Sequence, residues 1–357
     1  MCDEDFVMVL AQSMLNKQVT NARVRLAALV VLVGAAGLAG GCAEIKVAQS
    51  EQMIQKGDAL LEQNELQSAL AEFDAAVQLS PQLAVAHSRK GVVYRRMGDY
   101  EQAIDSFAEA VRLEPNSFFD TINLAQLYYY THRMFDAIEA YLHACDLKPD
   151  DFDANLHLGV CYQQVDDPVQ AVERFQKAIS IDPDRMHAYV NLGVAYDRLG
   201  KYYEAIDAYK KALERDSHQP QVMVNLAQTY INQERYKIAK KALEQAIVMD
   251  PSLAASHEAM GLCLSRMRDS DGAYEAYQKA LAINPKLPAA LAGLGCLEMV
   301  RVIDNKPNAR REIAMEYWHR SLELDSNQPM VRRFIEKYKQ TPKPPDAVLL
   351  GDAGSGD

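Results

Sequence analysis

The residues of this chain that could do chemistry are its histidines, its cysteines and one pair of adjacent carboxylates. A metal site needs such ligands at short spacing, and covalent catalysis needs a nucleophile beside a base. The eight histidines are scattered along the 357 residues. The six cysteines lie far apart, without CxxC or other metal-ligand spacing, at positions 2, 42, 145, 161, 263 and 296. Neither a zinc site nor a disulfide framework is indicated.

The acidic pair is also a poor candidate for a chemical site, and the overall charge argues against one class of partner. The stretch VDDPVQ, residues 165–170, places two carboxylates before Pro168, which is typical of a helix N-cap and not of a metal site. The formal net charge of −11 argues against nucleic-acid binding, because neutralising phosphates needs a basic face. The hydrophobic content of 49% indicates a folded chain.

An interval of 34 residues organises the sequence. Prolines recur at 81, 115, 149, 183, 251 and 285, and Ser217 holds the remaining place in that series. Three other series keep the same interval: alanines from Ala69 to Ala273, large residues from Phe73 to Tyr277, and small residues from Gly57 to Gly295. Self-similarity of this length indicates a stack of supersecondary units.

Each unit has the pattern of two amphipathic helices. In one of them Leu192 and Tyr196, and then Tyr209 and its neighbouring alanines, recur at three- and four-residue spacing. Gly200 between the two runs predicts a helix C-terminus. The proline near the end of each unit stops the second helix, because it cannot continue the hydrogen-bond ladder.

The series small-x-x-Tyr, Ala-x-x-x-aromatic-x-x-Ala and a closing proline resembles that of tetratricopeptide repeat (TPR) proteins from residue 50 to about 285. The resemblance implies an all-α protein, a right-handed superhelix or α-solenoid of about eight helix-turn-helix repeats. Seven regular repeats cover 50–83, 84–117, 118–151, 152–185, 186–219, 220–253 and 254–287. The eighth, 288–328, has seven extra residues, which we expect to lengthen both of its helices. A capping helix at 329–340 would close the stack, before a flexible tail at 341–357.

Within this frame the candidate chemical groups become packing residues. His87 and His257 share one repeat position that bulky packing residues usually occupy. Cys161 and Cys263 share a small buried position, where thiols act as small hydrophobes. Cys145 is expected on the helix before that of Cys161, and whether the two pair is left open. The repeats leave no room for a catalytic domain, so we expect no enzyme activity, metal or cofactor.

The first 41 residues have the layout of an export signal. An uncharged run from Leu26 to Gly41 follows three basic residues and is short for a membrane-spanning helix. Its end, LAGGC, resembles a bacterial lipoprotein signal, which implies that Cys42 is lipid-modified and forms the mature N-terminus. Translation from Met14 would remove the acidic stretch that fits no signal. An uncleaved N-terminal anchor is the alternative.

The expected location follows from that cysteine. A tether of residues 42–49 would join the lipid to the repeats, and its extended residues would reach about 25 Å. The chain resembles bacterial envelope TPR lipoproteins, which are assembly factors for pili, secretion systems, outer-membrane machinery or cell-wall enzymes. The resemblance implies an exported protein on the periplasmic face of the outer membrane. A cytoplasmic TPR adaptor is the alternative, and it would show no signal cleavage.

Three consecutive tyrosines, Tyr128, Tyr129 and Tyr130, point to a binding surface. On a helix they span about 200°, so they cannot all face one core. Tyr128 matches packing tyrosines of other repeats, and the other two occupy positions that face the concave groove of TPR proteins, where partners bind. Tyrosine and arginine concentrate binding energy at interfaces. The same face is expected to hold Arg95, Arg96, Phe119, Asn123, Gln126 and Gln163. The alternative is that Tyr129 and Tyr130 pack against the neighbouring repeat.

Asn123, Asn191 and Asn225 form a second expected feature of the groove. The series resembles the asparagine ladder of O-linked N-acetylglucosamine transferases, whose amides hold a peptide backbone, since an amide both donates and accepts. The carboxylate clamp of chaperone-binding TPRs is absent, because Ile54 and Asp58 replace its lysine and asparagine.

The sequence therefore predicts a non-catalytic scaffold or adaptor of the bacterial cell envelope that binds a peptide or protein segment in a concave groove. It predicts no nucleic-acid partner and no small-molecule substrate. An accessory subunit that presents peptides to a separate glycosyltransferase is a further alternative, and it would depend on the asparagines more than on the tyrosines.

Overall fold

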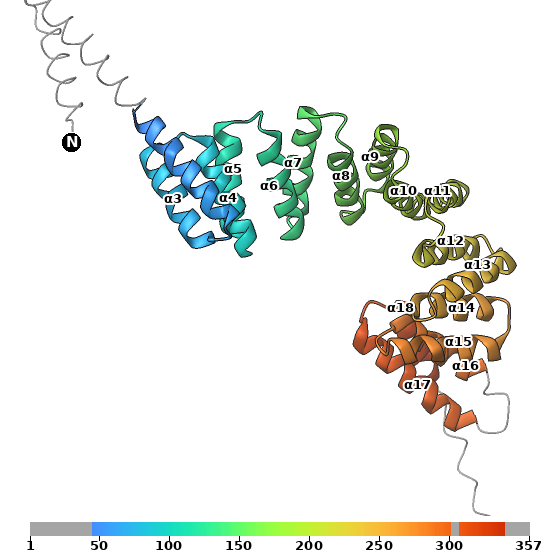
Figure 1. Ribbon diagram of the computed structural model, residues 1–357. Coiled ribbons are helices and arrows are strands. Elements are labelled where there is room, and N and C mark those ends of the chain that lie inside the picture. Colours follow the sequence, from blue (N-terminus) through green and yellow to red (C-terminus); the bar gives the residue numbers. More distant parts are fainter. Residues whose placement is uncertain (1–44, 301–306, 340–357) are drawn as a thin grey trace, which may run out of the picture. The chain divides into compact units, whose positions relative to one another are not determined.

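The computed structural model describes residues 45–300 and 307–339. In these ranges the regular structure is helical throughout, as an opening helix over residues 45–62 and then helices α3 to α18 (Figure 1). The prediction of an all-α protein built from repeated helix pairs is confirmed. The export signal, Cys42, part of the eighth repeat's insertion and the tail lie outside the described residues.

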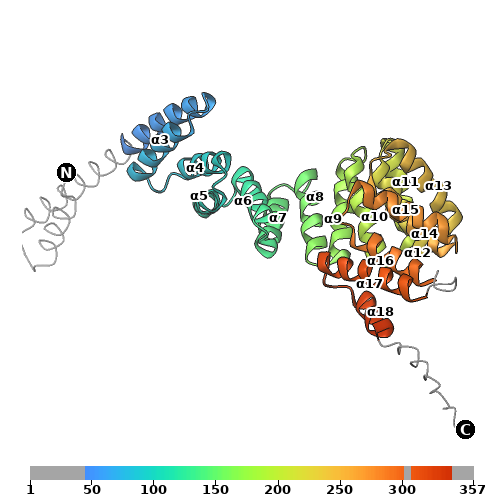
Figure 2. The ribbon, with the colours of Figure 1, turned by 90° about the horizontal axis from the view of Figure 1, so that it is seen from below.

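The chain divides into two compact units at residue 167. The first contains the opening helix, α3 (Leu66–Leu79), α4 (Ala84–Met97), α5 (Tyr100–Leu113), α6 (Phe118–Tyr130), α7 (Met134–Leu147) and α8 (Phe152–Gln164). The second contains α9 (Pro168–Ile181), α10 (Met186–Arg198), α11 (Tyr202–Arg215), α12 (Pro220–Asn232), α13 (Tyr236–Met249), α14 (Ala254–Arg266), α15 (Ser270–Ile283), α16 (Pro288–Val300), α17 (Pro307–Leu324) and α18 (Pro329–Lys339). Within each unit, helices that follow one another in a repeat pack side by side (Figure 2).

The turn inside each repeat depends on one residue with left-handed backbone. Gly200 has φ +69°, its N–H donates to the carbonyl of Asp197, and the next N–H donates to the carbonyl of Tyr196. These two bonds make a Schellman motif, so the predicted helix C-terminus at Gly200 is confirmed. Other repeats place a non-glycine residue in this conformation, such as Asn64 at φ +61° and Glu234 at φ +60°.

Close contact between the two helices of a repeat explains the small-residue series. A Cβ atom added at Gly193 would lie 2.5 Å from the ring of Tyr209, and one added at Gly91 would lie 2.8 Å from the ring of Phe107. The aromatic rings, which are buried, therefore press directly on the backbone of the first helix. The small-residue series and the aromatic series, each with an interval of 34 residues, are therefore the two sides of one contact between helices.

The two ends of the array differ from the predicted boundaries. Residues 45–49, expected in an extended tether, belong to the opening helix, because no Pro or Gly interrupts the helix-forming sequence before residue 50. In the eighth repeat α17 has 18 residues against 14 in the other second helices, and Pro307 begins it about one turn early. The first helix, α16, shows 13 residues up to Val300, where the description stops, so lengthening is found only in α17.

α18 covers the last helix pair. Its Phe334 and Tyr338 stack on the buried ring of Trp318, with ring centroids 5.4 Å and 5.9 Å apart. Without this helix the apolar side of α17 would face water, which explains why the stack is closed by an extra amphipathic helix. Among the described helices, none has the length and apolar character needed to cross a membrane.

Candidate interaction surfaces

The first candidate surface is the exposed side of α6, which we call the α6 face. Ser117 caps the helix by accepting the N–H of Asp120 at 3.3 Å. Leu124 and Leu127 turn into the core, whereas Phe119 near one end is 49% exposed and Tyr130 at the other is 68% exposed. Gln126 between them is half-buried. The helix thus presents aromatic side chains at both ends of an accessible side.

The three tyrosines have three different environments. Tyr128 is half-buried under the guanidinium of Arg133, which lies 4.5 Å from its ring centre. Tyr129 is also half-buried and packs partly on the core of its own repeat. Tyr130 is the most exposed, and its ring stacks on that of Tyr100 from α5 at 6.4 Å and 15°. One tyrosine of the expected pair is therefore fully available, and the other is divided between the core and the surface.

The aromatic cluster consists of Tyr100, Tyr129 and Tyr130, because Tyr129 meets Tyr130 edge-on at 6.1 Å. Sequence reasoning missed Tyr100, which begins α5 and is 44% exposed. No signal in the sequence distinguishes it, since Tyr202 and Tyr236 begin their helices in the same way. Its contribution depends on contact between neighbouring repeats.

Asn123 departs from the expectation of an amide that faces a ligand. Its side chain is 4% exposed, its Nδ2 donates to the carbonyl of Phe119 at 2.7 Å, and its Oδ1 accepts from Nη1 of Arg95. Both ends of the amide are thus already used, because the arginine on α4 is long enough to reach it. Arg96 donates to the carbonyl of Leu61 at 3.2 Å and so satisfies the end of the opening helix. Gln163 is likewise buried, at 8% exposure.

The second unit holds a hollow of about 360 Å³ over the first helices of three successive repeats, which we call the α14 hollow. Its walls include Val224 from α12, Leu262 from α14 and the small residues Ala255, Ala259 and Ala289. Its polar groups are the amides of Asn225 and Gln228, the hydroxyl of Tyr277 and the carboxylate of Glu258. Of these lining residues the sequence had singled out Asn225, which is half-buried and accepts from Gln221 at 3.2 Å. Asn191, the remaining member of the series, lies half-buried on α10.

Glu258 differs from the other carboxylates of its unit. It forms no hydrogen bond or ion pair with the described residues, and burial raises the pKa of its carboxyl group. Sequence reasoning missed it because one glutamate on a helix has no distinguishing pattern. A signal was present in the repeat alignment, since Ala259 and Gly293 end the asparagine series at the place where the hollow opens.

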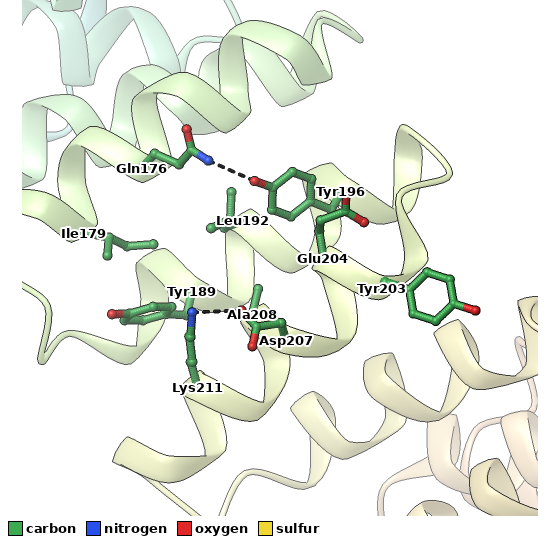
Figure 3. Close-up of a pocket in the computed structure, with 10 residues that line it drawn as sticks. All are labelled: Gln176, Ile179, Tyr189, Leu192, Tyr196, Tyr203, Glu204, Asp207, Ala208 and Lys211. Atoms are coloured by element: carbon green, nitrogen blue, oxygen red, sulfur yellow. Dashed lines mark hydrogen bonds and ion pairs between the residues drawn. The ribbon is translucent and has the colours of Figure 1, made fainter.

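A larger hollow of about 480 Å³ lies between α9, α10 and α11, and several of its polar side chains bond to one another (Figure 3). Gln176 donates to the hydroxyl of Tyr196 at 2.8 Å, and Lys211 pairs with Asp207 at 2.8 Å. The first bond joins α9 to α10, and the second lies within α11. The arrangement favours a structural role for this region.

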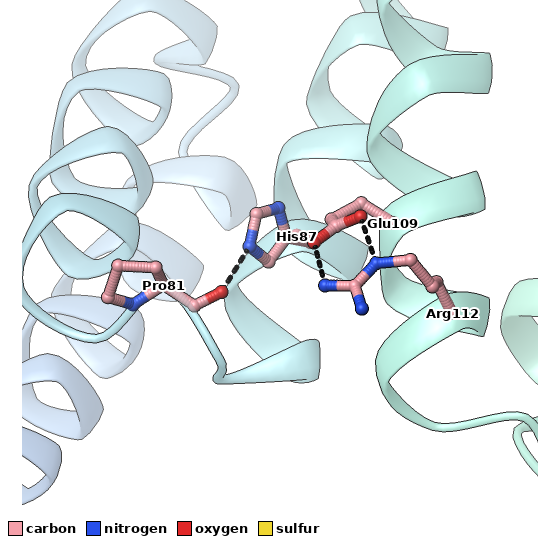
Figure 4. Close-up of polar contacts among 4 residues, drawn as sticks. All are labelled: Pro81, His87, Glu109 and Arg112. Atoms are coloured by element: carbon pink, nitrogen blue, oxygen red, sulfur yellow. Dashed lines mark hydrogen bonds and ion pairs between the residues drawn. The ribbon is translucent and has the colours of Figure 1, made fainter.

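The two histidines that share a repeat position have a structural task. Nε2 of His87 donates to the carbonyl of Pro81 at 2.9 Å, beside the Glu109–Arg112 ion pair (Figure 4). His257 makes the same bond to Pro251 at 3.0 Å. Each ring therefore satisfies a carbonyl in the turn between repeats. Across the residues 45–300 and 307–339, no group of His, Cys, Asp or Glu is placed to hold a metal ion.

The two cysteines whose pairing was open are both buried in one cluster of the first unit. Within the described chain no disulfide joins Cys145 to Cys161. Burial raises the pKa of the Cys161 thiol to about 12. Cys263, at the equivalent small position, has a thiol that points to the carbonyl of Tyr236 at 3.3 Å. These contacts agree with thiols that act as packing groups.

Comparison with known proteins supports the assignment of the repeats. Sequence models described as "Tetratricopeptide repeat" match residues 84–117, 188–219, 224–288 and 152–185, and one described as "TPR repeat" matches 57–98. Together they match just over half of the chain. No curated protein is significantly similar to the sequence.

Several solved structures share the fold. The C-terminal part of a TPR repeat-containing protein from Cytophaga hutchinsonii is 19% identical, with a TM-score of 0.56 over 68% of this chain and 99% of that one. A tetratricopeptide repeat protein from Parabacteroides merdae is 17% identical, with a TM-score of 0.50 over 75% and 99%. A chain of the APC/C hetero-tetramer Cut9-Hcn1 is 14% identical, with a TM-score of 0.54 over 80% and 55%. At these identities the likeness is one of fold alone. With its helix pairs, its 34-residue contacts and these matches, the chain belongs to the tetratricopeptide repeat proteins.

Proposed function

We propose that this chain is a non-catalytic scaffold that binds a segment of a partner protein along the α6 face. The observation that supports this most is the aromatic cluster, in which Tyr130 is 68% exposed while stacked on Tyr100. Exposed aromatic groups gathered on one surface are typical of interaction sites, and tyrosine is prominent among residues that dominate binding energy.

The dimensions of the α6 face suit a short extended peptide. Phe119 and Tyr130 are eleven residues apart on one helix, which separates them by about 16 Å along the axis. That distance corresponds to about five residues of an extended chain. Arg95 and Arg96 lie exposed on the preceding first helix, α4, and place positive charge beside this surface. A segment with apolar or aromatic anchors and a nearby carboxylate would complement it.

We further propose that the protein is exported and held at a membrane by a lipid on Cys42. The support is the uncharged run that ends in LAGGC, with basic residues before it. Mass spectrometry of the protein from native membranes should give a mature N-terminus at an acylated Cys42. A soluble protein that retains residues 1–41 would instead favour a cytoplasmic adaptor.

Crosslinked affinity capture from native membranes tests the proposed surface. Tyr130→Ala alone and together with Tyr129→Ala should lose a partner that the unchanged protein retains. Phe135→Ala is the matched control, because Phe135 is 79% exposed on α7 of the same repeat, outside the cluster. Capture of the same partners by all variants would contradict the α6 face as the binding site. A large fall in melting temperature in the double variant would identify Tyr129 as a packing residue.

A further inference from the structure

The α14 hollow exists because two repeats have small residues where others have large ones. Ala255 and Ala289, second in their helices, replace residues such as Gln221 and His187. Ala259 and Gly293 stand where Asn191 and Asn225 stand in the preceding repeats. Gly293 also makes room for Tyr277, because a Cβ there would lie 2.5 Å from the tyrosine ring. The missing side chains leave a space whose walls are mostly apolar.

One half-buried carboxylate in this hollow, that of Glu258, has no counter-ion among the described residues. Glu258 forms no ion pair or hydrogen bond with the residues that the structure describes, although burial of an unpaired carboxylate is costly. Asp197 in an earlier repeat shows the usual solution, since it accepts hydroxyl hydrogen bonds from Tyr209 and Thr229 at 2.9 Å and 2.8 Å. The carboxylate of Glu258 accepts no such bond from the described residues.

The polar groups around Glu258 carry no positive charge. The elements packed around it contribute Tyr277 from α15, the amides of Asn225 and Gln228 from α12, and no positively charged residue among those that line the hollow. Gln228 donates to Asn232 at 3.2 Å through its Nε2, which leaves its carbonyl oxygen for another group. A positively charged ligand that donates several hydrogen bonds would suit the carboxylate of Glu258 and the carbonyl oxygen of Gln228.

We propose that the α14 hollow binds the side chain of an arginine from a partner protein, with Glu258 as its counter-ion. Arginine presents five donors in a planar fork that matches a carboxylate and further acceptors, whereas lysine presents three. Its methylene stem is apolar, as are the walls formed by Val224, Leu262 and the alanines. The net charge of −11 favours a basic segment over an acidic one at long range. The α14 hollow is separate from the α6 face, so this proposal does not depend on the proposed function.

Binding of single amino-acid analogues to the full chain tests this proposal. The probes are Nα-acetyl-arginine methylamide, its lysine counterpart and its citrulline counterpart, which has the shape of arginine without the charge. Alanine methyl groups labelled with ¹³C report occupancy at Ala255, Ala259 and Ala289, which line the hollow. The arginine probe should shift these signals at the lowest concentration, lysine at a higher one, and citrulline least.

Three variants separate the hollow from general charge effects. Glu258→Gln should weaken the arginine probe by about tenfold or more, because it removes a charge-assisted contact. Ala289→Leu should weaken it by narrowing the mouth, since Ala289 is exposed and a larger side chain is tolerated there. Glu275→Gln, at an exposed carboxylate of α15, should leave binding unchanged.

The melting temperatures of the same variants distinguish a binding role of Glu258 from a purely structural one. Glu258→Gln should raise the melting temperature of the free protein while it reduces the stabilising effect of the probe at a given probe concentration. Equal shifts with citrulline, no shift at any concentration reached, or equal weakening by Glu275→Gln would each overturn the proposal. A fall in melting temperature for Glu258→Gln, with probe binding unchanged, would do so as well.

Discussion

At the scale of single residues, Asp197 shows how this fold tolerates a buried carboxylate. Its Oδ2 accepts from the hydroxyls of Tyr209 and Thr229, which come from two different helices. Burial raises the pKa of the carboxyl group, although both hydrogen bonds act to lower it. The aspartate therefore joins α10 to α11 and α12, and the two donors offset only part of the cost of its desolvation.

Removing one of these donors should be costly. In Tyr209→Phe the carboxylate loses a hydrogen bond to a charged acceptor, and the free energy of unfolding should fall by about 1.5–3 kcal/mol. Tyr277→Phe is the matched control at the same repeat position, because the described residues give its hydroxyl no hydrogen bond. It should change stability by less than about 0.5 kcal/mol. Urea unfolding of both variants checks the difference, and equal losses would contradict the assigned bond.

Above about pH 4, two carboxyl groups should make the free energy of unfolding larger as the pH is lowered. Burial raises the pKa of Asp197 and of Glu258, so the folded state holds protons that the unfolded state has released. Their contribution to the free energy of unfolding should therefore rise as pH falls from neutral through the raised pKa, until the ordinary pKa of about 4 is reached. Urea unfolding across this window, with Asp197→Asn and Glu258→Gln combined, should show a rise in the unchanged protein that the double variant reduces.

Asp216 and Asp250 affect the free energy of unfolding in the opposite direction and in a different pH range. Hydrogen bonds from Gln219 to Asp216 and from Ser252 to Asp250 lower the pKa of each carboxyl group. Their stabilising contribution is present above the ordinary pKa and is lost as pH falls through the lowered one. Because that loss occurs below about pH 4, it does not mask the first effect.

At the scale of helices, α18 protects the end of the second unit. Trp318 is 1% exposed and is the one tryptophan of the chain. Tryptophan fluorescence therefore reports the packing around this side chain and no other part of the chain. Phe334→Ala should shift the emission to longer wavelength and reduce the free energy of unfolding by about 1–3 kcal/mol, because Phe334 is half-buried on the indole ring. Phe135→Ala, an exposed aromatic of the first unit, is the control and should leave the emission unchanged. Unchanged emission in Phe334→Ala would contradict the packing of α18 on α17.

The helices themselves could be predicted from the sequence because each repeat uses the same contacts. Gly200 fixed one helix end through its backbone conformation, and the small residue at Gly193 anticipated the contact with Tyr209. The helical conformation of residues 45–49 could not be predicted from the repeat pattern, because those residues precede the first repeat and only local propensity favours the helix there.

The candidate surfaces were less predictable because they depend on what neighbouring repeats do together. The repeat position of Asn123 indicated the groove, but an arginine on another helix occupies its amide. Tyr130 was anticipated from its helix phase, whereas its stacking partner Tyr100 was not. Glu258 is a candidate only because the alanines around it leave a hollow, which depends on the packing of several repeats. Helix phase can be read from one repeat, and side-chain pairing across repeats cannot.

At the scale of the whole molecule, the division at residue 167 predicts unfolding in more than one step. Repeat arrays gain stability from nearest neighbours, so their parts can unfold at different denaturant concentrations. Trp318 reports the second unit, whereas far-ultraviolet circular dichroism reports the helices of both. The two transitions in urea should not coincide, and Phe334→Ala should move the fluorescence transition further than the dichroism transition. Coincident transitions in both proteins would indicate one cooperative unit.

The burial of the thiols has a consequence for how long the protein survives. Burial raises the pKa of the Cys161 thiol to about 12, so the thiol and not the thiolate is the form present at neutral pH. Burial also raises the pKa of Cys263 and of Cys296. Oxidants and disulfide-exchange enzymes react with the thiolate, so these residues would age slowly wherever the chain resides. The core thus has a kinetic protection against oxidation that requires no repair enzyme and no partner.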